Sequence, residues 1–263
     1  MPGGLVFTDG HSVQHARLRP LTGREEEWLA RYSRMPAAAR VTWILRECLI
    51  WLEDVPVTIN LVRQLLVGDR DYLILQLRHL TLGDEVHAVI QCPACNEKID
   101  VDFRVSEIPI EQRSQTNSSH ILKLADRSVR FRLPTGGDQE AVLGMTTEEA
   151  MDELFDRCLL DDGGKEPSKG DRETISEMMG RIAPEVNLEL DLMCTECNHG
   201  FIQAFDTTAY FFDEMVANGK QLLREVHALA LYYHWSERDI LSLTRDRRRE
   251  YLGLLHESLQ RQD

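Results

Sequence analysis

Two CxxC pairs constrain the fold of this chain more than any other feature of its sequence. Cys92 and Cys95 form the first pair, and Cys194 and Cys197 form the second. A CxxC turn places two thiolates on one side of a tight loop, so it supplies half of a tetrahedral metal site. Strand-like residues flank both pairs: HAVIQ and KIDVDF surround the first, and NLELDLM and GFIQAF surround the second. The pattern predicts two strand–CxxC–strand knuckles that share one structural zinc ion.

The separation of the two pairs leaves a second arrangement open. Between them lie 98 residues, far more than a zinc ribbon usually holds. Either a subdomain is inserted between the two knuckles of one site, which we favour, or each pair binds metal elsewhere.

A catalytic or redox role for the two CxxC pairs is less favoured than structural zinc binding. Four thiolates leave no coordination position for water, so the predicted zinc is structural rather than catalytic. A thioredoxin-like redox motif is disfavoured because neither pair lies at a strand-to-helix step. His199 follows the second pair and is expected to be a turn residue rather than a ligand. Cys48 and Cys158 lie in apolar, helix-like contexts and are expected to be buried.

The composition excludes several functional classes. The chain has 263 residues, a formal net charge of -14, 43% hydrophobic and 28% charged residues, which is ordinary for a folded globular protein. This acidity disfavours nucleic-acid binding, which needs a basic face against the phosphates. No apolar run reaches the length of a membrane helix, and the first 20 residues lack the apolar core of a secretory signal. We therefore expect a cytoplasmic protein with no membrane segment and no nucleic-acid partner.

No set of residues in the sequence points to catalysis. The glycine-rich segment PTGGD at 134–138 lacks the Lys-Ser/Thr of a phosphate loop and is interpreted as a helix entry. His227 and His234 share a helical face, but no nucleophile or acid–base partner accompanies them. We expect neither enzyme activity nor a small-molecule substrate.

Hydrophobic periodicity predicts an α+β fold made of four regions. An arm and helices occupy residues 1–83, and further helices occupy residues 209–263. A zinc-ribbon-like β module combines residues 84–104 with 186–208, and an inserted hairpin and acidic helical region occupies residues 105–185. We expect the helical N- and C-terminal parts to pack together around this small antiparallel module.

Local patterns refine these regions. An apolar stripe predicts a helix over residues 38–52, and Asp69 is the candidate N-cap of the helix that follows. Alternation over residues 120–134 predicts a hairpin. Residues 211–263 are expected to be helical throughout and to pack their apolar stripe against the N-terminal helices around Trp43 and Trp51.

Three segments, in their order along the chain, resemble one protein family. They are LLVGDRDYLILQLRHLTLGDEV running into the first CxxC pair, FRLPTGGDQE at 131–140, and the C-terminal stretch from EVH at 225–227 through YHWSE at 233–237 to RRREYL at 247–252. With HARLRPLTGREEEWLA near the start, the chain is similar to baseplate and tail-assembly proteins of contractile-tailed bacteriophages and phage-tail-like contractile injection systems. The resemblance extends from about residue 16 to about residue 256.

The resemblance implies a structural or assembly component of a baseplate, and not an enzyme. Its implied partners are other baseplate, hub or tail proteins. Such a protein is expected in the cytoplasm during assembly and in the baseplate of the particle. The alternative is a cytosolic zinc-ribbon adaptor or regulator that is unrelated to tails.

The C-terminal arginine run is a candidate docking surface. Its arginines cannot all pair within their own helix, because only residues three or four apart face one another. Some must point outward, and guanidinium groups beside aromatic rings are typical of protein interfaces. The candidate surface comprises Tyr233, His234, Trp235, Arg245, Arg247, Arg248 and Arg249. A solvated basic face beside buried aromatic residues is the alternative.

Overall fold

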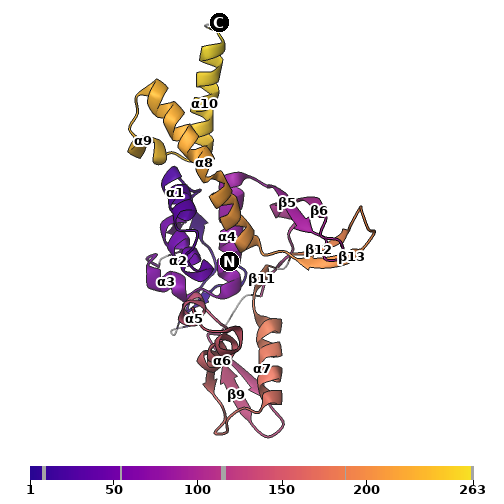
Figure 1. Cartoon of the computed structure of the whole chain (residues 1–263). Coiled ribbons are helices and arrows are strands. Elements are labelled where there is room, and N and C mark those ends of the chain that lie inside the picture. Colours follow the sequence, from indigo (N-terminus) through magenta and orange to yellow (C-terminus); the bar gives the residue numbers. More distant parts are fainter. Residues whose placement is uncertain (8–9, 54, 114–116, 187, 262–263) are drawn as a thin grey trace. The chain divides into compact units, whose positions relative to one another are not determined.

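The structure is a computed structural model that describes the chain except for residues 8–9, 54, 114–116, 187 and 262–263 (Figure 1). Its residues fall into two compact units. The first comprises Met1–Arg17, Ala38–Leu73 and Pro109–Asn187, and the second comprises Leu18–Ala37, Ile74–Ile108 and Leu188–Asp263. Neither unit is a continuous stretch of sequence, so both depend on contacts between distant segments.

Both units combine helices with small antiparallel sheets. The first contains β1 (Leu5–Val6), β2 (Ser12–Val13), β4 (Leu49–Trp51), α3 (Ile59–Gln64), β7 (Ile110–Glu111), β8 (His120–Lys123), β9 (Ser128–Phe131), α5 (Gly136–Ala141), α6 (Thr147–Cys158), β10 (Leu159–Asp161), α7 (Lys169–Ile182) and β11 (Glu185–Val186). The second contains α1 (Gly23–Arg31), β5 (Glu85–Gln91), β6 (Lys98–Arg104), η1 (Val105–Glu107), β12 (Glu189–Met193), β13 (Gly200–Ala204), α8 (Thr207–Tyr233), α9 (Glu237–Leu241) and α10 (Arg245–Gln260). The boundary between the units falls within β3 (Arg17–Leu18), α2 (Ala37–Cys48) and α4 (Val67–Leu82).

The strand pairings confirm the predicted class of fold. Every pairing whose register is described is antiparallel, and the sheets have two or three strands. The chain is therefore a mixture of helices and small antiparallel sheets, as the α+β prediction requires. The arrangement of the helical parts around the cysteine-bearing module stays a prediction.

Helix α2 buries the stripe that its sequence predicts. Val41, Ile44 and Cys48 are all buried, because they recur at helical spacing. The helix is shorter than predicted, since it ends at Cys48 and the chain continues as strand β4. The β-branched and aromatic residues after Cys48 favour extended backbone. This extended segment brings Trp51 under Arg17, whose guanidinium carbon lies 5.6 Å from the ring centroid.

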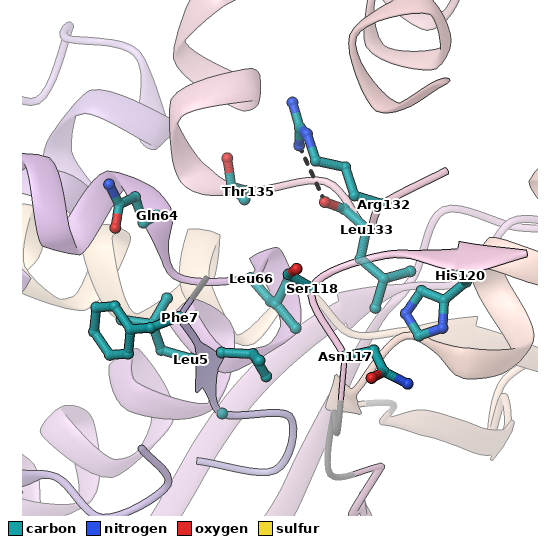
Figure 2. Close-up of a pocket in the computed structure, with 12 residues that line it drawn as sticks. Leu5, Phe7, Gln64, Leu66, Asn117, Ser118, His120, Arg132, Leu133 and Thr135 are labelled. Atoms are coloured by element: carbon teal, nitrogen blue, oxygen red, sulfur yellow. Dashed lines mark hydrogen bonds between the residues drawn. The ribbon is translucent and has the colours of Figure 1, made fainter. Parts of the chain in front are cut away.

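The prediction that Asp69 caps helix α4 is wrong, because the helix begins two residues earlier. The buried Asp69 carboxylate instead accepts hydrogen bonds from the backbone N–H groups of Gly3 and Gly4, both at 2.8 Å. Burial raises the pKa of Asp69, although these two donors oppose the shift. Asp69 thereby holds the N-terminal arm, which continues into β1 and places Leu5 beside Leu66 (Figure 2).

A three-stranded sheet carries a separate apolar core in the first unit. β8 and β9 form the predicted hairpin, and β10 pairs with the other side of β9. Phe131 and Ile175 are fully buried in this core, and Phe155 of α6 is nearly so. The core therefore lies where the sheet meets helices α6 and α7.

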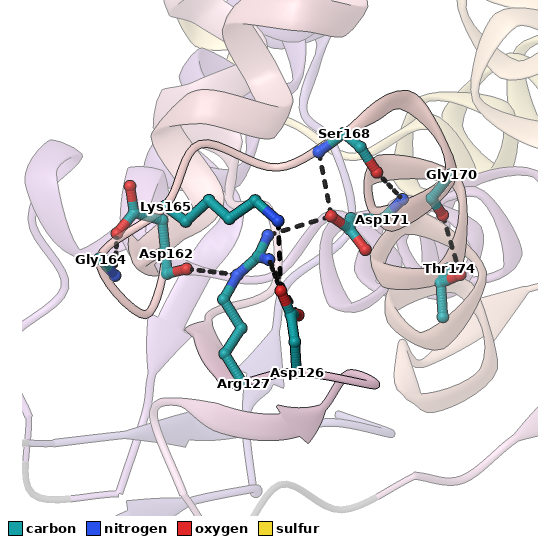
Figure 3. A network of polar contacts seen from close by, with 9 residues as sticks. All are labelled: Asp126, Arg127, Asp162, Gly164, Lys165, Ser168, Gly170, Asp171 and Thr174. Carbon is teal, nitrogen blue, oxygen red and sulfur yellow. Dashed lines mark hydrogen bonds and ion pairs between the residues drawn. The ribbon is translucent and has the colours of Figure 1, made fainter.

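Polar contacts hold the loop before α7 against the hairpin turn (Figure 3). Arg127 donates to the main-chain oxygen of Asp162 at 2.9 Å and to the carboxylate of Asp171 at 3.0 Å. Asp126 pairs with Lys165 at 3.2 Å. Some carboxylates of this acidic region therefore have cationic partners close by in the same unit.

The C-terminal part of the chain forms helices α8, α9 and α10, which are joined by short non-helical segments at 234–236 and 242–244, so the prediction that residues 211–263 are helical throughout is too broad. The expected packing around Trp43 and Trp51 stays a prediction. α8 packs against α1 and against α9 and α10. Gly219 permits a close approach, since a Cβ atom there would lie 3.0 Å from the Cβ of Ala30. Leu222, Leu229 and Ile240 form the apolar core between these helices. Although α8 is long, no helix in the described part of the chain is apolar enough to cross a bilayer.

Candidate metal centre

The first CxxC pair lies at the tip of a regular hairpin. β5 and β6 pair in continuous register from Glu85 opposite Arg104 to Gln91 opposite Lys98. The turn is closed by the N–H of Cys92, which donates to the main-chain oxygen of Glu97 at 2.8 Å. The N–H of Asn96 donates back to the main-chain oxygen of Cys92 at 2.9 Å. The strand–CxxC–strand prediction is confirmed here.

The second pair repeats this geometry on β12 and β13. The N–H of Cys194 donates to the main-chain oxygen of His199 at 3.0 Å, and the N–H of Asn198 donates to that of Cys194 at 2.9 Å. Asn96 and Asn198 both adopt left-handed backbone, with φ of 62° and 55°. Asparagine tolerates this conformation better than most residues, which explains its place after each pair.

The thiols of both knuckles gather in one cluster. All four Sγ atoms lie within 4.8 Å of one another. Those of Cys92 and Cys197 are 3.7 Å apart, and those of Cys95 and Cys194 are 3.6 Å apart. Tetrahedral Zn–S bonds of about 2.3 Å put sulfur atoms about 3.8 Å apart, whereas a disulfide needs about 2 Å. The cluster therefore has the size of a site for one metal ion.

The thiols of the cluster cannot all ionise easily without a cation. Burial opposes ionisation of Cys92, but backbone N–H groups of Cys95 and Ala94 lower its pKa to about 7. For Cys95 the backbone N–H of Glu97 favours the thiolate, yet burial and the neighbouring thiols raise its pKa to about 12. A divalent cation removes this conflict because it stabilises all of the thiolates together.

His199 is placed as a turn residue and lies outside the cysteine cluster. Its ring is exposed and stacks on Phe201 with 6.0 Å between centroids. Cys48 and Cys158 are both buried, as predicted for structural thiols.

The β5–β6 hairpin is anchored at its base by residues that the sequence patterns did not indicate. Arg78 is buried, donates to the main-chain oxygen of Glu85 at 2.8 Å, and pairs with the carboxylate of Glu214 at 2.9 Å. The hydroxyl of Tyr210 donates to the main-chain oxygen of His87 at 2.5 Å. The one sequence signal for these contacts is an arginine inside the apolar run LILQLRHL. Helices α4 and α8 thus hold the β5 strand that carries the first knuckle.

The structure corrects the prediction of a single arginine surface. Arg248 is fully buried, and its Nη2 and Nε atoms bond to Glu26 and Glu225, each at 2.9 Å. Arg245 is also buried, with a guanidinium nitrogen 3.8 Å from Glu26. These two side chains face the helices of their own unit, because the polar groups there compensate their charge. They are not available for docking.

The other candidates for docking lie at or near the surface. Arg247 and Arg249 are exposed on α10. His234 is exposed at the left-handed end of α8, with φ of 58°. Tyr233 and Trp235 are half-buried and stack with 5.0 Å between their ring centroids. These aromatic rings pack on the edge of the helical core, and their role in docking stays a prediction.

The family of the chain follows from a comparison with known proteins. A family model described as T4 bacteriophage base plate protein matches residues 8–161, which are more than half of the chain. The matched range includes the first CxxC pair and ends before the second. No curated protein and no solved structure matches the chain. As the resemblance of its segments predicts, the chain belongs to the family of T4 bacteriophage base plate proteins.

Proposed function

We propose that this baseplate component is a non-enzymatic structural or assembly protein, in which one Zn²⁺ bound by Cys92, Cys95, Cys194 and Cys197 holds the ribbon module together. The observation that best supports this proposal is the gathering of the four Sγ atoms within 4.8 Å. Four thiolates complete a tetrahedral shell around Zn²⁺, so no position remains for a reacting water. The metal therefore stabilises the fold rather than taking part in a reaction.

The ribbon needs such a link because each half of it is a two-stranded hairpin. Met193 and Ile202 are 68% and 67% exposed, so the second hairpin buries little apolar surface. A two-stranded hairpin is only marginally stable in water by itself. A metal ion that joins the two tips contributes its binding free energy to folding. On this basis we assign residues 84–104 and 186–208 to one module and residues 105–185 to an insertion.

Contacts with other proteins are the proposed mode of action. Leu231, Tyr232 and Leu254 on the C-terminal helices are 56%, 49% and 54% exposed. The exposed Arg247 and Arg249 lie on the same helix as Leu254. Exposed apolar side chains next to arginine are typical of protein interfaces. We propose that other baseplate, hub or tail proteins bind here, during assembly in the cytoplasm and in the particle of a phage or a related contractile injection system.

Metal analysis of the purified protein tests the zinc site. We expect about one zinc per chain, as a closed four-cysteine site requires. Replacing the four ligands by serine should abolish the bound zinc. The matched control is the double variant Cys48→Ala/Cys158→Ala, which removes two thiols outside the cluster and should keep the zinc. Undiminished zinc in the quadruple serine variant would contradict the proposal.

Charge reversal tests the docking role. The double variant Arg247→Glu/Arg249→Glu changes two exposed side chains and should leave the isolated protein folded. We expect it to fail in complementing tail assembly, because it repels an acidic partner surface. Lys98→Glu/Lys169→Glu reverses two other exposed cations and is the control. Normal contractile particles from the arginine variant would show that these side chains are solvated surface only.

A further inference from the structure

Helices α1, α8 and α9 of the second unit enclose an apolar groove. The cavity has a volume of about 380 Å³, and all of its lining residues belong to this one unit. The lining residues that are buried are Leu222, Val226 and Leu241, so its deepest part is apolar.

Two large apolar side chains of α8 line the same groove and are exposed. Val216 and Leu223 are 41% and 59% exposed. Together with Gly219 and Val226 they recur along α8 at alternating spacings of three and four residues. This spacing is typical of helices that insert side chains between those of a second helix. Within the described part of the chain Val216 and Leu223 stay exposed, so this face of α8 has room for a further helix.

Helix α1 runs antiparallel to α8, which orders the groove residues along it. Near the C-terminal end of α1, Ala30 lies against Gly219. One helical turn earlier, Glu26 shares the guanidinium group of Arg248 with Glu225, which lies further along α8. The C-terminal end of α1 therefore lies near the middle of α8, and its earlier residues lie toward the C-terminal end of α8.

The charged residues that line the groove change sign along it. Arg31 and Lys220 are at the end next to Gly219. Glu27 lies one turn earlier on α1, and Glu237 begins α9 just after α8 ends, so both carboxylates lie toward the other end. Within the described part of the chain no ion pair neutralises these four groups. The groove thus has a basic end, an acidic end and no net charge.

We propose that the groove binds a second copy of this chain, so that two α8 helices pack antiparallel about a two-fold axis between Gly219 and Leu223. Such an axis places the basic end of each groove on the acidic end of the other, as a self-complementary interface requires. Each Leu223 covers Gly219 of the other copy, and each Val216 covers Val226. With α1 of each copy alongside, the helices form a four-helix bundle. The inference goes beyond the proposed function, because it uses neither the metal site nor the C-terminal arginines.

Sedimentation velocity of the full-length protein over a concentration series tests the proposal. We expect a monomer–dimer equilibrium that Leu223→Glu weakens at least about tenfold, because a carboxylate would be buried between the two helices. Leu254→Glu is the matched control, since Leu254 is 54% exposed and lies on α10 outside the groove. A chain that stays monomeric up to about 100 μM would overturn the proposal, as would equal dimerisation of the two variants.

Charge reversal at one end of the groove separates two-fold pairing from unspecific apolar association. Arg31→Glu/Lys220→Glu makes all four groups acidic, and Glu27→Lys/Glu237→Lys makes all four basic. We expect neither double variant to dimerise alone and an equimolar mixture of the two to form a heterodimer, because each end then meets the opposite charge. A mixture that restores no dimer would contradict the two-fold arrangement.

Carbodiimide cross-linking of the unaltered protein tests the interface even if a variant fails to fold. A mixture of isotopically light and heavy chains distinguishes links between copies from links within one copy. We expect Lys220 of one copy to be joined to Glu27 or Glu237 of the other. A dimer whose cross-links all lie elsewhere would show that a different surface associates, which also overturns the proposal.

Discussion

Replacement of Arg248 by methionine probes the buried charge cluster of the second unit. The guanidinium group of Arg248 bonds to Glu225 and Glu26, each at 2.9 Å, and to the main-chain oxygen of Leu243 at 3.0 Å. Methionine is unbranched and flexible, so it can fill most of the vacated space. The substitution therefore removes the positive charge and leaves two carboxylates in the interior.

The expected loss of stability is large. Removing one partner of a buried ion pair costs about 3–5 kcal/mol. Arg245 remains with a guanidinium nitrogen 3.8 Å from Glu26 and keeps part of the compensation. We therefore expect the free energy of unfolding to fall by about 3 kcal/mol at pH 7, the lower end of that range.

The loss should depend on pH in a defined direction. Burial already raises the pKa of Glu26, although Arg248 opposes the shift. Without Arg248 this pKa rises further above its value in the unfolded chain. A raised carboxyl pKa weakens the fold as pH rises through it, so the loss at pH 5 should be smaller than at pH 7.

Urea unfolding at both pH values, followed by circular dichroism and tryptophan fluorescence, measures these changes. Arg247→Met is the matched control, because this neighbouring side chain is 55% exposed and its loss should change stability by less than about 0.5 kcal/mol. Adding Glu225→Gln to the methionine variant should recover part of the loss, since the remaining carboxylate of Glu26 still faces Arg245. Equal losses for the two arginine variants, or a loss that is the same at both pH values, would refute the reasoning.

Two further predictions concern the first unit. A Cβ atom at Gly136 would lie 1.3 Å from Nη1 of the buried Arg70, so Gly136→Ala should lower the free energy of unfolding by about 3 kcal/mol. The adjacent Gly137→Ala has ordinary contacts from 3.5 Å and should stabilise helix α5 by up to about 1 kcal/mol, and urea unfolding compares the two. Burial alone would raise the pKa of Asp138, but Arg132 and the N–H and hydroxyl of Thr135 hold it well below its usual range. The stabilisation of the fold by ionised Asp138 is therefore fully present above about pH 4 and is lost on acidification. A pH series of unfolding curves should show that Asp138→Asn lacks this part of the acid dependence of stability.

The features that the sequence predicts well are set by near neighbours along the chain. Each knuckle needs only a CxxC turn, a residue that accepts left-handed backbone and two short strands, and all of these lie within about 20 consecutive residues. The β8–β9 hairpin is local in the same sense. The helix predicted over residues 38–52 is longer than the observed one because its apolar stripe continues through Leu49 and Leu52. Both residues are buried, but they lie in an extended segment. Burial pattern alone does not distinguish the end of a helix from a short buried strand.

The contacts that the sequence does not reveal join residues far apart. Asp69 meets Gly3 and Gly4 across 66 and 65 positions, and Arg248 meets Glu26 across 222. Arg78 reaches Glu214 across 136 positions. The local sequence around each of these charged residues contains no information about its partner. Only the folded chain places its partner, so no local pattern can predict the pair.

Both units of this acidic chain contain buried arginines, and the helical phase of an arginine can indicate from the sequence that it is buried. Arg70 is 1% exposed and donates to the main-chain oxygen of Ala38 at 2.7 Å. With 44 acidic residues against 30 basic ones, the surrounding field favours a cation, which reduces the cost of burying it. In α10, Arg245 and Arg248 are three positions apart and share a helical face with the half-buried Leu252, whereas Arg247 lies on another face. An arginine run on an amphipathic helix therefore divides by phase into core and surface residues, and only the surface residues can bind a partner.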